Sequence, residues 1–520
     1  MATQDHVVIV GAGIGGLVSA ALLAARGLAV TVVEAAAAPG GKMRVVVADG
    51  VAIDGGPTVF TLRHVFDAVF DACGESLDDH LTLTPATILA RHAWGADRLD
   101  LFADPAASEA AIADFAGVRE AAGYRAFRAE AQRIFTTLDR PLLRAPQTNP
   151  IGLTWRLGWR GFADLNRIRP YESLWRALGD HFRDPRLRQL FGRYATYCGS
   201  SPFQAPGTLM LVAHVEAAGV WLIDGGMHRL AQALAALAER KGATFRYSAP
   251  VSEILVTRGR AAGVVLASGE RIAASMVVCN ADPAALAAGA FGDAVRRAVP
   301  AMPARRRSLS AMVWCARGTA AGFPLVRHNV FFSTDSRSEF DALAAGRLAD
   351  EPSVYVCAQD RGADHAAAPQ RAERFQIIVN APATGDTHPL TLAETDQCTQ
   401  SMHATLSRAG LTLDLPAQAT VLTTPADFAT LFPRTGGALY GPVSHGWAAS
   451  FRRPGSRTRI PGLYCAGGST HPGAGVPMAA LSARLAVDSL LRDHASMARS
   501  HPVAMPGGMS TPSARTVASA

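Results

Sequence analysis

The stretch HVVIVGAGIGGLVSAALLAARGLAVTVVEA, residues 6–35, decides the fold of this chain. It reads as an apolar strand, a glycine turn, an Ala/Leu-rich helix and a second apolar strand. Gly11, Gly13 and Gly16 give the spacing GxGxxG directly after the first strand. The first glycine permits a tight turn, the second lets a phosphate approach the backbone, and the third lets the helix pack close to the sheet. Glu34 ends the second strand, where a carboxylate accepts hydrogen bonds from ribose hydroxyls, so the stretch predicts a dinucleotide site.

Two further glycine turns come soon after this stretch. PGGKMR, residues 39–44, places Lys42 and Arg44 beside glycines, where the two charges could neutralise a pyrophosphate; the alternative is a solvated basic turn. DGGPTVF, residues 54–60, joins glycine to proline. That pairing fixes a sharp turn able to lie against a flat ring, although alone it is an ordinary turn. Both turns extend the expected nucleotide site.

The other end of the chain repeats the pattern in IPGLYCAGGSTHPGAGVPMAALSARLAVDSLL, residues 460–491. A short apolar run meets glycines, and an Ala/Leu-rich helical pattern follows. The chain therefore has a strand–glycine loop–helix unit at each end. We explain this by a single domain that the first segment begins and the last segment completes.

Composition limits the class of protein. The chain has 520 residues, of which 49% are hydrophobic, with a formal net charge of +7. Such a chain should be globular, with two or three domains. The basic balance suits anionic lipid, nucleic acid or acidic substrates alike, and we discount nucleic acid because only the charge favours it. The seven cysteines form no CxxC pair, so we expect reduced thiols in a cytosolic protein, with neither a disulfide framework nor a metal site.

Taken in order, a set of motifs resembles the flavin-dependent carotenoid desaturases of the amine-oxidase-like superfamily. They are GAGIGGL, VVEA, PGGKMR, DGGPTVFT, DGGMHRLAQAL, VVCNADP and AGGSTHPGAGVPMAALSAR. The resemblance covers nearly the whole chain apart from the tail. It implies that FAD is the cofactor and that both glycine loops hold this one molecule.

The resemblance also implies the cofactor-binding residues. Glu34 would hold the adenosine ribose, Lys42 would lie near the phosphates, and the backbone of Val251 would meet the adenine. The full set is Gly11, Gly13, Gly15, Gly16, Glu34, Gly41, Lys42, Arg44, Gly56, Pro57, Thr58, Val251, Gly467, Gly468, Gly475, Val476 and Met478. The sequence AGGSTHPGAG departs from the usual C-terminal loop, which leaves the choice among Gly467, Gly468 and Ser469 open.

Within the family, the chain resembles a bacterial branch that acts on acyclic 1-hydroxycarotenoids and forms their C3–C4 double bond. Stretches such as HFRDPRLRQLFGRYATYCG and EAAGVWLIDGGMH carry this resemblance. The reaction it implies is hydride transfer to the flavin followed by proton loss, with oxygen or a quinone as the final electron acceptor. No side chain is then expected to be catalytic.

Six side chains are candidates for contact with the substrate. His64 is a candidate for the hydroxyl end, and the tyrosines and tryptophan are candidates for a polyene tunnel, because aromatic faces pack well against conjugated chains. The alternative for each is an ordinary packing or turn role. The set is His64, Tyr194, Tyr197, Trp221, His445 and His471.

The expected fold class is α/β, with a Rossmann-like FAD-binding domain built from discontinuous segments and an inserted α+β substrate domain. The first would comprise residues 1–65, 221–285 and 455–495, the second residues 66–220 and 286–454, and residues 496–520 would be a disordered tail. The helical part of the substrate domain could face a membrane. Trp155, Trp159 and Trp175 stand among arginines in residues 153–193, a composition that suits lipid headgroups or else a solvated helical face. We therefore expect a peripheral location on the inner membrane.

Two alternatives remain open from the sequence. One is a phytoene-type desaturase or carotene isomerase on the same scaffold. The other is a non-catalytic prenyl-lipid carrier of the GDP-dissociation-inhibitor type, which shares the architecture. The complete set of cofactor motifs, from Gly11 through Glu34 to the C-terminal loop, favours an FAD enzyme over the carrier.

Overall fold

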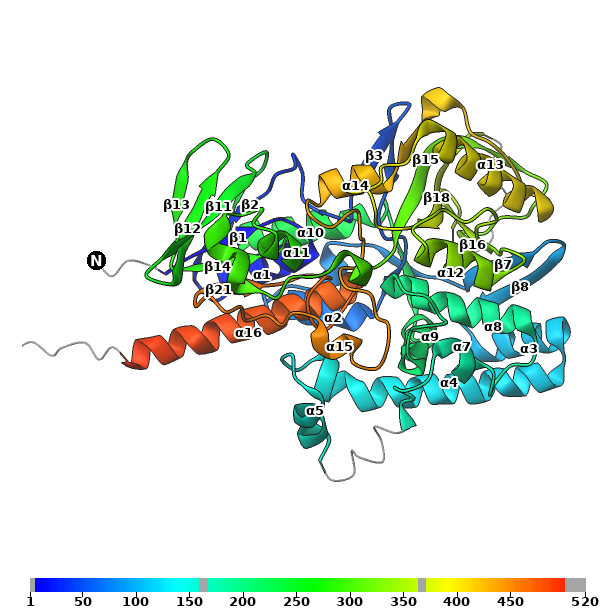
Figure 1. Ribbon diagram of the computed structural model, residues 1–520, viewed down its shortest axis with the longest axis horizontal. Helices are drawn as coiled ribbons and strands as arrows, with labels where there is room; N and C mark the ends of the chain where they lie inside the picture. The colour runs from blue at the N-terminus through cyan, green and yellow to red at the C-terminus, as the bar shows by residue number, and fades with distance from the viewer. Residues whose placement is uncertain (1–4, 159–166, 363–370, 501–520) are drawn as a thin grey trace, which may run out of the picture.

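A five-stranded parallel sheet forms one end of the molecule (Figure 1). The structure is a computed structural model that describes residues 5–158, 167–362 and 371–500. The strand order is β10-β2-β1-β14-β21, with bounds β1 His6–Val10, β2 Ala29–Val33, β10 Thr244–Arg246, β14 Met276–Cys279 and β21 Leu463–Cys465. The first and last glycine loops thus follow strands of the same sheet, as their shared pattern predicts.

Layers on both faces explain why these strands are apolar on both sides. Three helices cover one face: α1 Ile14–Ala24, α10 His228–Arg240 and α16 Val476–Ser500. An antiparallel sheet covers the other, formed by β11 Val251–Thr257, β12 Arg260–Leu266 and β13 Arg271–Ala273. Every residue of α1 is buried. A Cβ atom at Gly16 would lie 2.0 Å from the Gly11 carbonyl oxygen, so this glycine lets the helix approach the strand.

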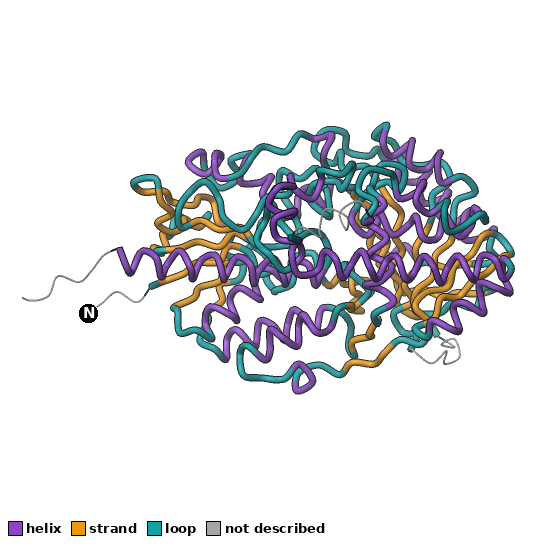
Figure 2. Tube along the Cα trace, turned by 90° about the horizontal axis from the view of Figure 1, so that it is seen from below, coloured by secondary structure: helices purple, strands orange, loops and turns teal. Residues whose placement is uncertain are grey.

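A second, largely antiparallel sheet occupies the opposite end, and Figure 2 shows the strands in two groups separated by helices and loops. Its main order is β19-β15-β18-β17-β16-β7-β8, with β20 also paired to β15. The bounds are β7 Ile88–Trp94, β8 Asp97–Phe102, β15 Ser310–Ala321, β16 His328–Phe331, β17 Val354–Ala358, β18 Glu373–Ala381, β19 Thr412–Asp414 and β20 Thr420–Thr423. Helices α12 Ser336–Ala344 and α13 Leu392–Arg408 accompany this sheet (Figure 1).

Helices connect the two ends below the sheets in Figure 1. These α-helices are α2 Arg63–Asp71, α3 Pro105–Ala116, α4 Val118–Leu138, α5 Pro150–Leu157, α7 Leu174–Leu178, α8 Pro185–Gly192 and α9 Leu211–Ala217. Short turns join them: η2 Asp139–Leu143, η3 Arg193–Cys198 and η4 Gly207–Met210. Helices α11 Pro283–Ala287, α14 Pro425–Leu431 and α15 Ala449–Arg452 flank the loops between the sheets. A hairpin of β3 Val45–Ala48 with β4 Val51–Asp54 and a three-stranded antiparallel sheet, in the order β5 Phe60–Thr61, β9 Val220–Ile223 and β6 Leu83–Pro85, complete the fold.

The α/β fold class is confirmed, while the domain boundaries remain a prediction. Helix α16 extends to Ser500, past the predicted start of the tail at residue 496, and residues 501–520 lie outside the described part of the chain. The seven cysteines are free thiols, as expected from their spacing. Within the described ranges, no helix combines the length and the apolar character needed to cross a bilayer.

Candidate cofactor and substrate site

A cavity of about 970 Å³ lies between the two sheets and collects residues from segments far apart in the chain. It is lined by the loop after β1, the end of β2, the loop after β14, the start of β11 and the C-terminal loop before α16. Strands β15, β16, β17 and β18 and turns η3 and η4 line the other side. The volume is at the upper end of the range for small-molecule sites.

The N-terminus of α1 faces the cavity through glycines. Gly11, Gly13 and Gly15 line it, and the N-cap position, Gly13, offers no side-chain cap to the first turn. A Cβ atom at Gly15 would lie 2.8 Å from the Gly467 Cα atom, so the loops of the two glycine motifs approach each other closely here. Uncapped N–H groups and the positive end of the helix dipole suit a pyrophosphate.

Asn280 connects the two glycine loops. Its side-chain N–H donates to the Ala466 carbonyl oxygen at 2.8 Å, and its Oδ1 atom lies 2.6 Å from where a Cβ atom at Gly13 would stand. Asn280 belongs to the motif VVCNADP, but the sequence alone did not indicate a role for its side chain. The signal was present, because Asn280 follows strand β14 at the same sheet edge as the other loops.

Glu34 marks the adenosine end of the cavity. Its carboxylate accepts hydrogen bonds from the backbone N–H of Ala12 at 2.5 Å and of Ala36 at 2.8 Å, which fix it at the end of β2. Val251 also lines the cavity, and Ala249, two residues before it, donates its N–H to the Glu34 carbonyl oxygen. The two residues predicted to meet the ribose and the adenine therefore lie close together.

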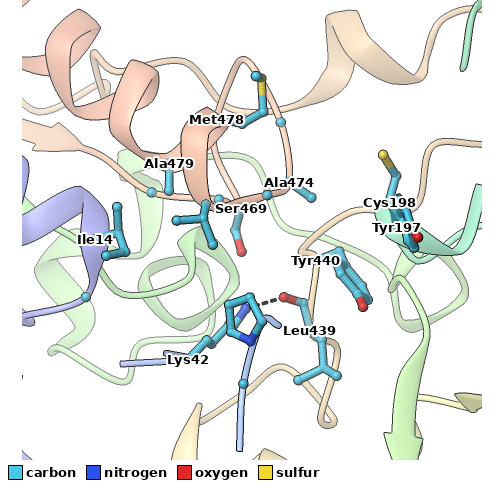
Figure 3. A pocket seen from close by; sticks show the side chains of 18 of the residues that line it. Ile14, Lys42, Tyr197, Cys198, Leu439, Tyr440, Ser469, Ala474, Met478 and Ala479 are labelled. Atoms are coloured by element: carbon cyan, nitrogen blue, oxygen red, sulfur yellow. Dashed lines mark hydrogen bonds between the residues drawn. The ribbon is translucent and has the colours of Figure 1, made fainter. Parts of the chain in front are cut away.

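Basic side chains line the cavity beyond this end. Lys42 is directed towards Leu439, whose carbonyl oxygen accepts a hydrogen bond from Nζ at 2.6 Å (Figure 3), and burial lowers the pKa of Lys42. Arg44 donates to the Thr423 hydroxyl at 2.7 Å, and its buried Nε atom has no partner within the described residues. The lysine therefore supports the neighbouring loop, while its predicted role beside the phosphates remains a prediction.

The C-terminal loop is held by a buried arginine that sequence reasoning missed. Arg453 donates to the carbonyl oxygens of Tyr440 and Gly468, both at 3.0 Å, and of Pro442 at 2.8 Å. Burial lowers the pKa of Arg453, but its three carbonyl partners satisfy the guanidinium. Figure 3 shows Ser469 and Ala474 of this loop opposite Lys42 and Tyr440, whereas the Met478 side chain points away from these two residues.

The structure brings nearly all of the predicted cofactor residues to this one cavity. Gly16 is the exception, because it packs against Gly11 beneath the helix. The lining members are Gly11, Gly13, Gly15, Glu34, Gly41, Lys42, Arg44, Gly56, Pro57, Thr58, Val251, Gly467, Gly468, Gly475, Val476 and Met478. Three features of this cavity suit an FAD molecule. Glycines stand where a side chain would collide with neighbouring atoms, a carboxylate lies at the end of a strand, and basic side chains line the wall.

The far part of the cavity is mostly apolar, which suits a long hydrocarbon chain. Its walls come from the end of α4, from η2 and from the η4–α9 segment: Leu138, Leu142, Leu143, Leu209, Leu211, Val212 and Val215. Two polar groups interrupt this surface. One contains Arg193, Tyr197 and Glu216, and the other contains Thr58, His328 and Tyr355.

Most of the predicted substrate contacts lie elsewhere. Of the six, Tyr197 lines the cavity, whereas Tyr194 lies behind it and donates a hydrogen bond to Glu216. Trp221 pairs with Phe60 across β5 and β9 and packs into the core of the FAD-side sheet. These two aromatic side chains pack as ordinary core residues do.

The three histidines also have structural partners. The Nε2 atom of His64 lies 2.8 Å from Nη2 of Arg144, outside the cavity lining. His445 accepts the backbone N–H of Ser201, and burial lowers its pKa to about 4. His471 is buried, and its Nε2 atom donates to the carbonyl oxygens of Leu142 and Ala145, both at 2.9 Å. The prediction that His64 contacts the substrate hydroxyl therefore does not fit the structure, because its ring is directed to Arg144.

Comparison with known proteins agrees with this geometry. Residues 14–491 match the model of the family described as flavin containing amine oxidoreductase. The chain is 53% identical to a hydroxyneurosporene desaturase of Rubrivivax gelatinosus, over 98% of each chain. It is 49% identical to a hydroxyneurosporene desaturase of Cereibacter sphaeroides, over 95% of this chain and 99% of the relative. The predicted resemblance to the carotenoid desaturases is confirmed.

Solved structures share the fold at low identity. An oxidoreductase from Methanosarcina mazei superposes with a TM-score of 0.57 at 16% identity, covering 94% of this chain and all of that one. Putrescine oxidase bound to putrescine gives a TM-score of 0.56 at 16% identity, covering 95% and 99%. The chain belongs to the family of flavin-containing amine oxidoreductases, and FAD is its cofactor.

Proposed function

We propose that this chain is an FAD-dependent carotenoid desaturase that forms the C3–C4 double bond of acyclic 1-hydroxycarotenoids. It would thus be a 1-hydroxycarotenoid 3,4-desaturase, also called a methoxyneurosporene dehydrogenase. The single observation that carries the proposal is the continuity of the cavity, which joins a dinucleotide cradle to an apolar chamber. The identity of 53% to a hydroxyneurosporene desaturase over nearly the full length supports the substrate class.

The residues of the chain would act mainly by binding and orientation. FAD, when bound, supplies the two-electron oxidation by accepting a hydride from the substrate. Gly13, Gly15 and Glu34 would hold the adenine dinucleotide part, and Gly56 and Pro57 would lie by the flavin ring. The leucine walls would align the polyene and exclude water, which brings the reacting carbons to one place.

An anaerobic single-turnover experiment tests this function. FAD-loaded protein with 1-hydroxyneurosporene should lose its oxidised-flavin absorbance, and the carotenoid should lose two mass units. A carrier of the GDP-dissociation-inhibitor type would bind the lipid with the flavin absorbance unchanged. We further propose that oxygen or a quinone accepts the electrons. Adding each in turn to the bleached protein identifies the acceptor by the return of the absorbance.

A membrane surface is the proposed source of the substrate. Helix α5 carries Ile151 and Trp155, whose exposed fractions are 71% and 83%, and Tyr171 and Trp447 contribute further exposed rings 6.0 Å apart. Figure 1 shows α5 at the lower edge of the molecule, and it follows the η2 turn whose leucines line the cavity. Exposed aromatic and aliphatic side chains next to arginines suit insertion at headgroup depth on the inner membrane.

The predicted membrane segment 153–193 needs one correction. Trp175 packs against Phe203, with ring centroids 4.8 Å apart, and beneath the Arg188 guanidinium, so it does not belong to the exposed surface. Trp159 lies outside the described residues.

The membrane proposal is tested by liposome pelleting with a double variant, Ile151→Ser with Trp155→Ser. Loss of pelleting with anionic vesicles is expected, because two exposed apolar side chains are removed. The control is Val118→Ser, since Val118 is also 82% exposed but begins α4, away from this surface. Equal pelleting of both variants would contradict the proposal.

A further inference from the structure

A compact polar cluster of Arg193, Tyr197 and Glu216 interrupts the apolar chamber, and Tyr194 supports it from behind. Arg193 Nη2 donates to the Tyr197 hydroxyl at 2.9 Å, and that hydroxyl donates to Glu216 Oε1 at 3.3 Å. The Tyr194 hydroxyl donates to the other carboxylate oxygen. Turn η3 supplies three of the four side chains and helix α9 supplies the carboxylate. These hydrogen bonds hold the guanidinium, the two phenol hydroxyls and the carboxylate in fixed positions relative to one another.

The cluster has more hydrogen-bonding capacity than its own members use. A guanidinium has five N–H donors, whereas Arg193 forms one side-chain hydrogen bond, with Tyr197, and its buried Nε atom has no partner among the described residues. Arg193, Tyr197 and Glu216 nevertheless line the cavity. Charged and polar groups in an apolar chamber are costly to bury unless they are satisfied. The remaining Nη donors of Arg193, which lines the cavity, therefore suit a polar group on the ligand.

A second polar group continues the cluster towards the flavin end. The Tyr355 hydroxyl lies 2.6 Å from the Thr58 hydroxyl and 2.8 Å from Nδ1 of His328. Thr58 directly follows Gly56 and Pro57, the turn predicted to lie against the flavin, and all five residues line the cavity. Burial lowers the pKa of His328 to about 3, so its ring is neutral near neutral pH. The polar surface therefore reaches from the chamber wall to the reacting end of the cavity.

We infer that Arg193 and Tyr197, oriented by Glu216, bind the tertiary hydroxyl of the carotenoid substrate; this inference rests on the proposed function. A hydroxyl both donates and accepts, so it can take an N–H from Arg193 while it bonds to the Tyr197 oxygen. The hydroxyl-bearing carbon is two carbons away from C3, so a hydrogen bond to that hydroxyl also positions the C3–C4 bond. A chain end without a hydroxyl leaves the cluster unpaired, which makes the cluster a specificity determinant.

The decisive comparison uses Tyr197→Phe and Arg193→Met, each loaded with FAD. Equilibrium binding and kcat/KM are measured with 1-hydroxyneurosporene and with neurosporene, which lacks the hydroxyl. Each variant should lower the preference for the hydroxylated carotenoid by about tenfold or more, through the loss of affinity for that ligand alone. Arg193→Lys should restore part of the preference, because a lysine keeps one charged donor.

Tyr247→Phe is the matched control, since it removes a phenol hydroxyl from a half-buried tyrosine that stacks on Phe245 outside the cavity lining. Its preference should equal that of the wild type. FAD content and circular dichroism check the fold, and if Arg193→Met fails to fold, Tyr197→Phe and Tyr355→Phe give the answer. An unchanged preference in well-folded, FAD-loaded Tyr197→Phe protein would overturn the inference. Because binding is measured separately, this result is distinguishable from failure of the proposed function, which is absence of turnover in the wild type.

Discussion

Gly13 and Asn280 allow the cofactor cradle to be tested apart from the fold. An alanine Cβ atom at Gly13 would stand 2.6 Å from Asn280 Oδ1, closer than atoms can pack. The Asn280 side chain would have to move and would lose its hydrogen bond to the Ala466 carbonyl oxygen. We expect Gly13→Ala to destabilise the apoprotein by about 1–3 kcal/mol, the range for an overpacked site together with one lost hydrogen bond.

The second variant, Asn280→Ala, removes the side chain with which an alanine at position 13 would collide. In the double variant, the methyl group of that alanine still faces the cofactor. On its own, Asn280→Ala costs only the hydrogen bond, about 1 kcal/mol. In the Asn280→Ala background, Gly13→Ala should therefore leave apoprotein stability nearly unchanged. FAD affinity should still fall by about tenfold or more, because the methyl group occupies the approach of the pyrophosphate.

The assay is a double-mutant cycle with two readouts. Chemical denaturation of the four apoproteins gives the stability, and titration with FAD, followed by quenching of flavin fluorescence, gives the affinity. Gly16→Ala serves as the structural control, since its Cβ atom would collide with the Gly11 carbonyl oxygen inside the fold, and it should lose stability and affinity together. If Gly13→Ala leaves FAD affinity unchanged in the Asn280→Ala background, the methyl group does not face the cofactor and the assigned cradle is wrong.

Three more outcomes follow from the contacts. Glu34→Gln should weaken FAD binding by about tenfold or more in the same titration, because a charged acceptor at the ribose position is lost. Arg453→Leu should lower both FAD content and the unfolding midpoint, since it leaves three carbonyl oxygens of two loops without their buried donor. Burial lowers the pKa of His92 from 6.5 to about 3, so the unfolded chain takes up a proton at higher pH than the folded chain. Stability from this group is complete above pH 6.5 and is lost as the pH falls towards 3, at up to about 1.4 kcal/mol per pH unit. His92→Leu should flatten the pH dependence of the denaturation midpoint, and a slope equal to that of the wild type would contradict the assignment.

The parallel sheet and the gathering of the two glycine loops at one cavity could be predicted from the sequence, because both depend on local patterns. GxGxxG after a strand specifies a turn, a helix start and a sheet edge together, and the role given to Gly16 in helix–strand packing matches its contact with Gly11. The second glycine loop was recognised by the same local pattern. In both cases the residues that matter lie within one strand–loop–helix unit.

The substrate half of the cavity could not be predicted in the same way. Arg193 and Glu216 lie in separate short elements, and only the fold brings them to one wall with Tyr197. The three histidines lie in segments that resemble the family, but a neighbouring backbone or side-chain group contacts the Nε2 atom of each ring. His471 illustrates the difference, since its ring holds the η2 turn to the C-terminal loop rather than facing the substrate.

The central claim is tested most directly by a paired turnover assay with purified, FAD-loaded protein and liposomes. Phytoene and 1-hydroxyneurosporene are supplied separately, and the products are identified by absorption and mass. The account predicts a loss of two mass units with a red shift for 1-hydroxyneurosporene and no reaction with phytoene. Desaturation of phytoene with 1-hydroxyneurosporene unchanged would contradict it and would assign the chain to the phytoene-type desaturases.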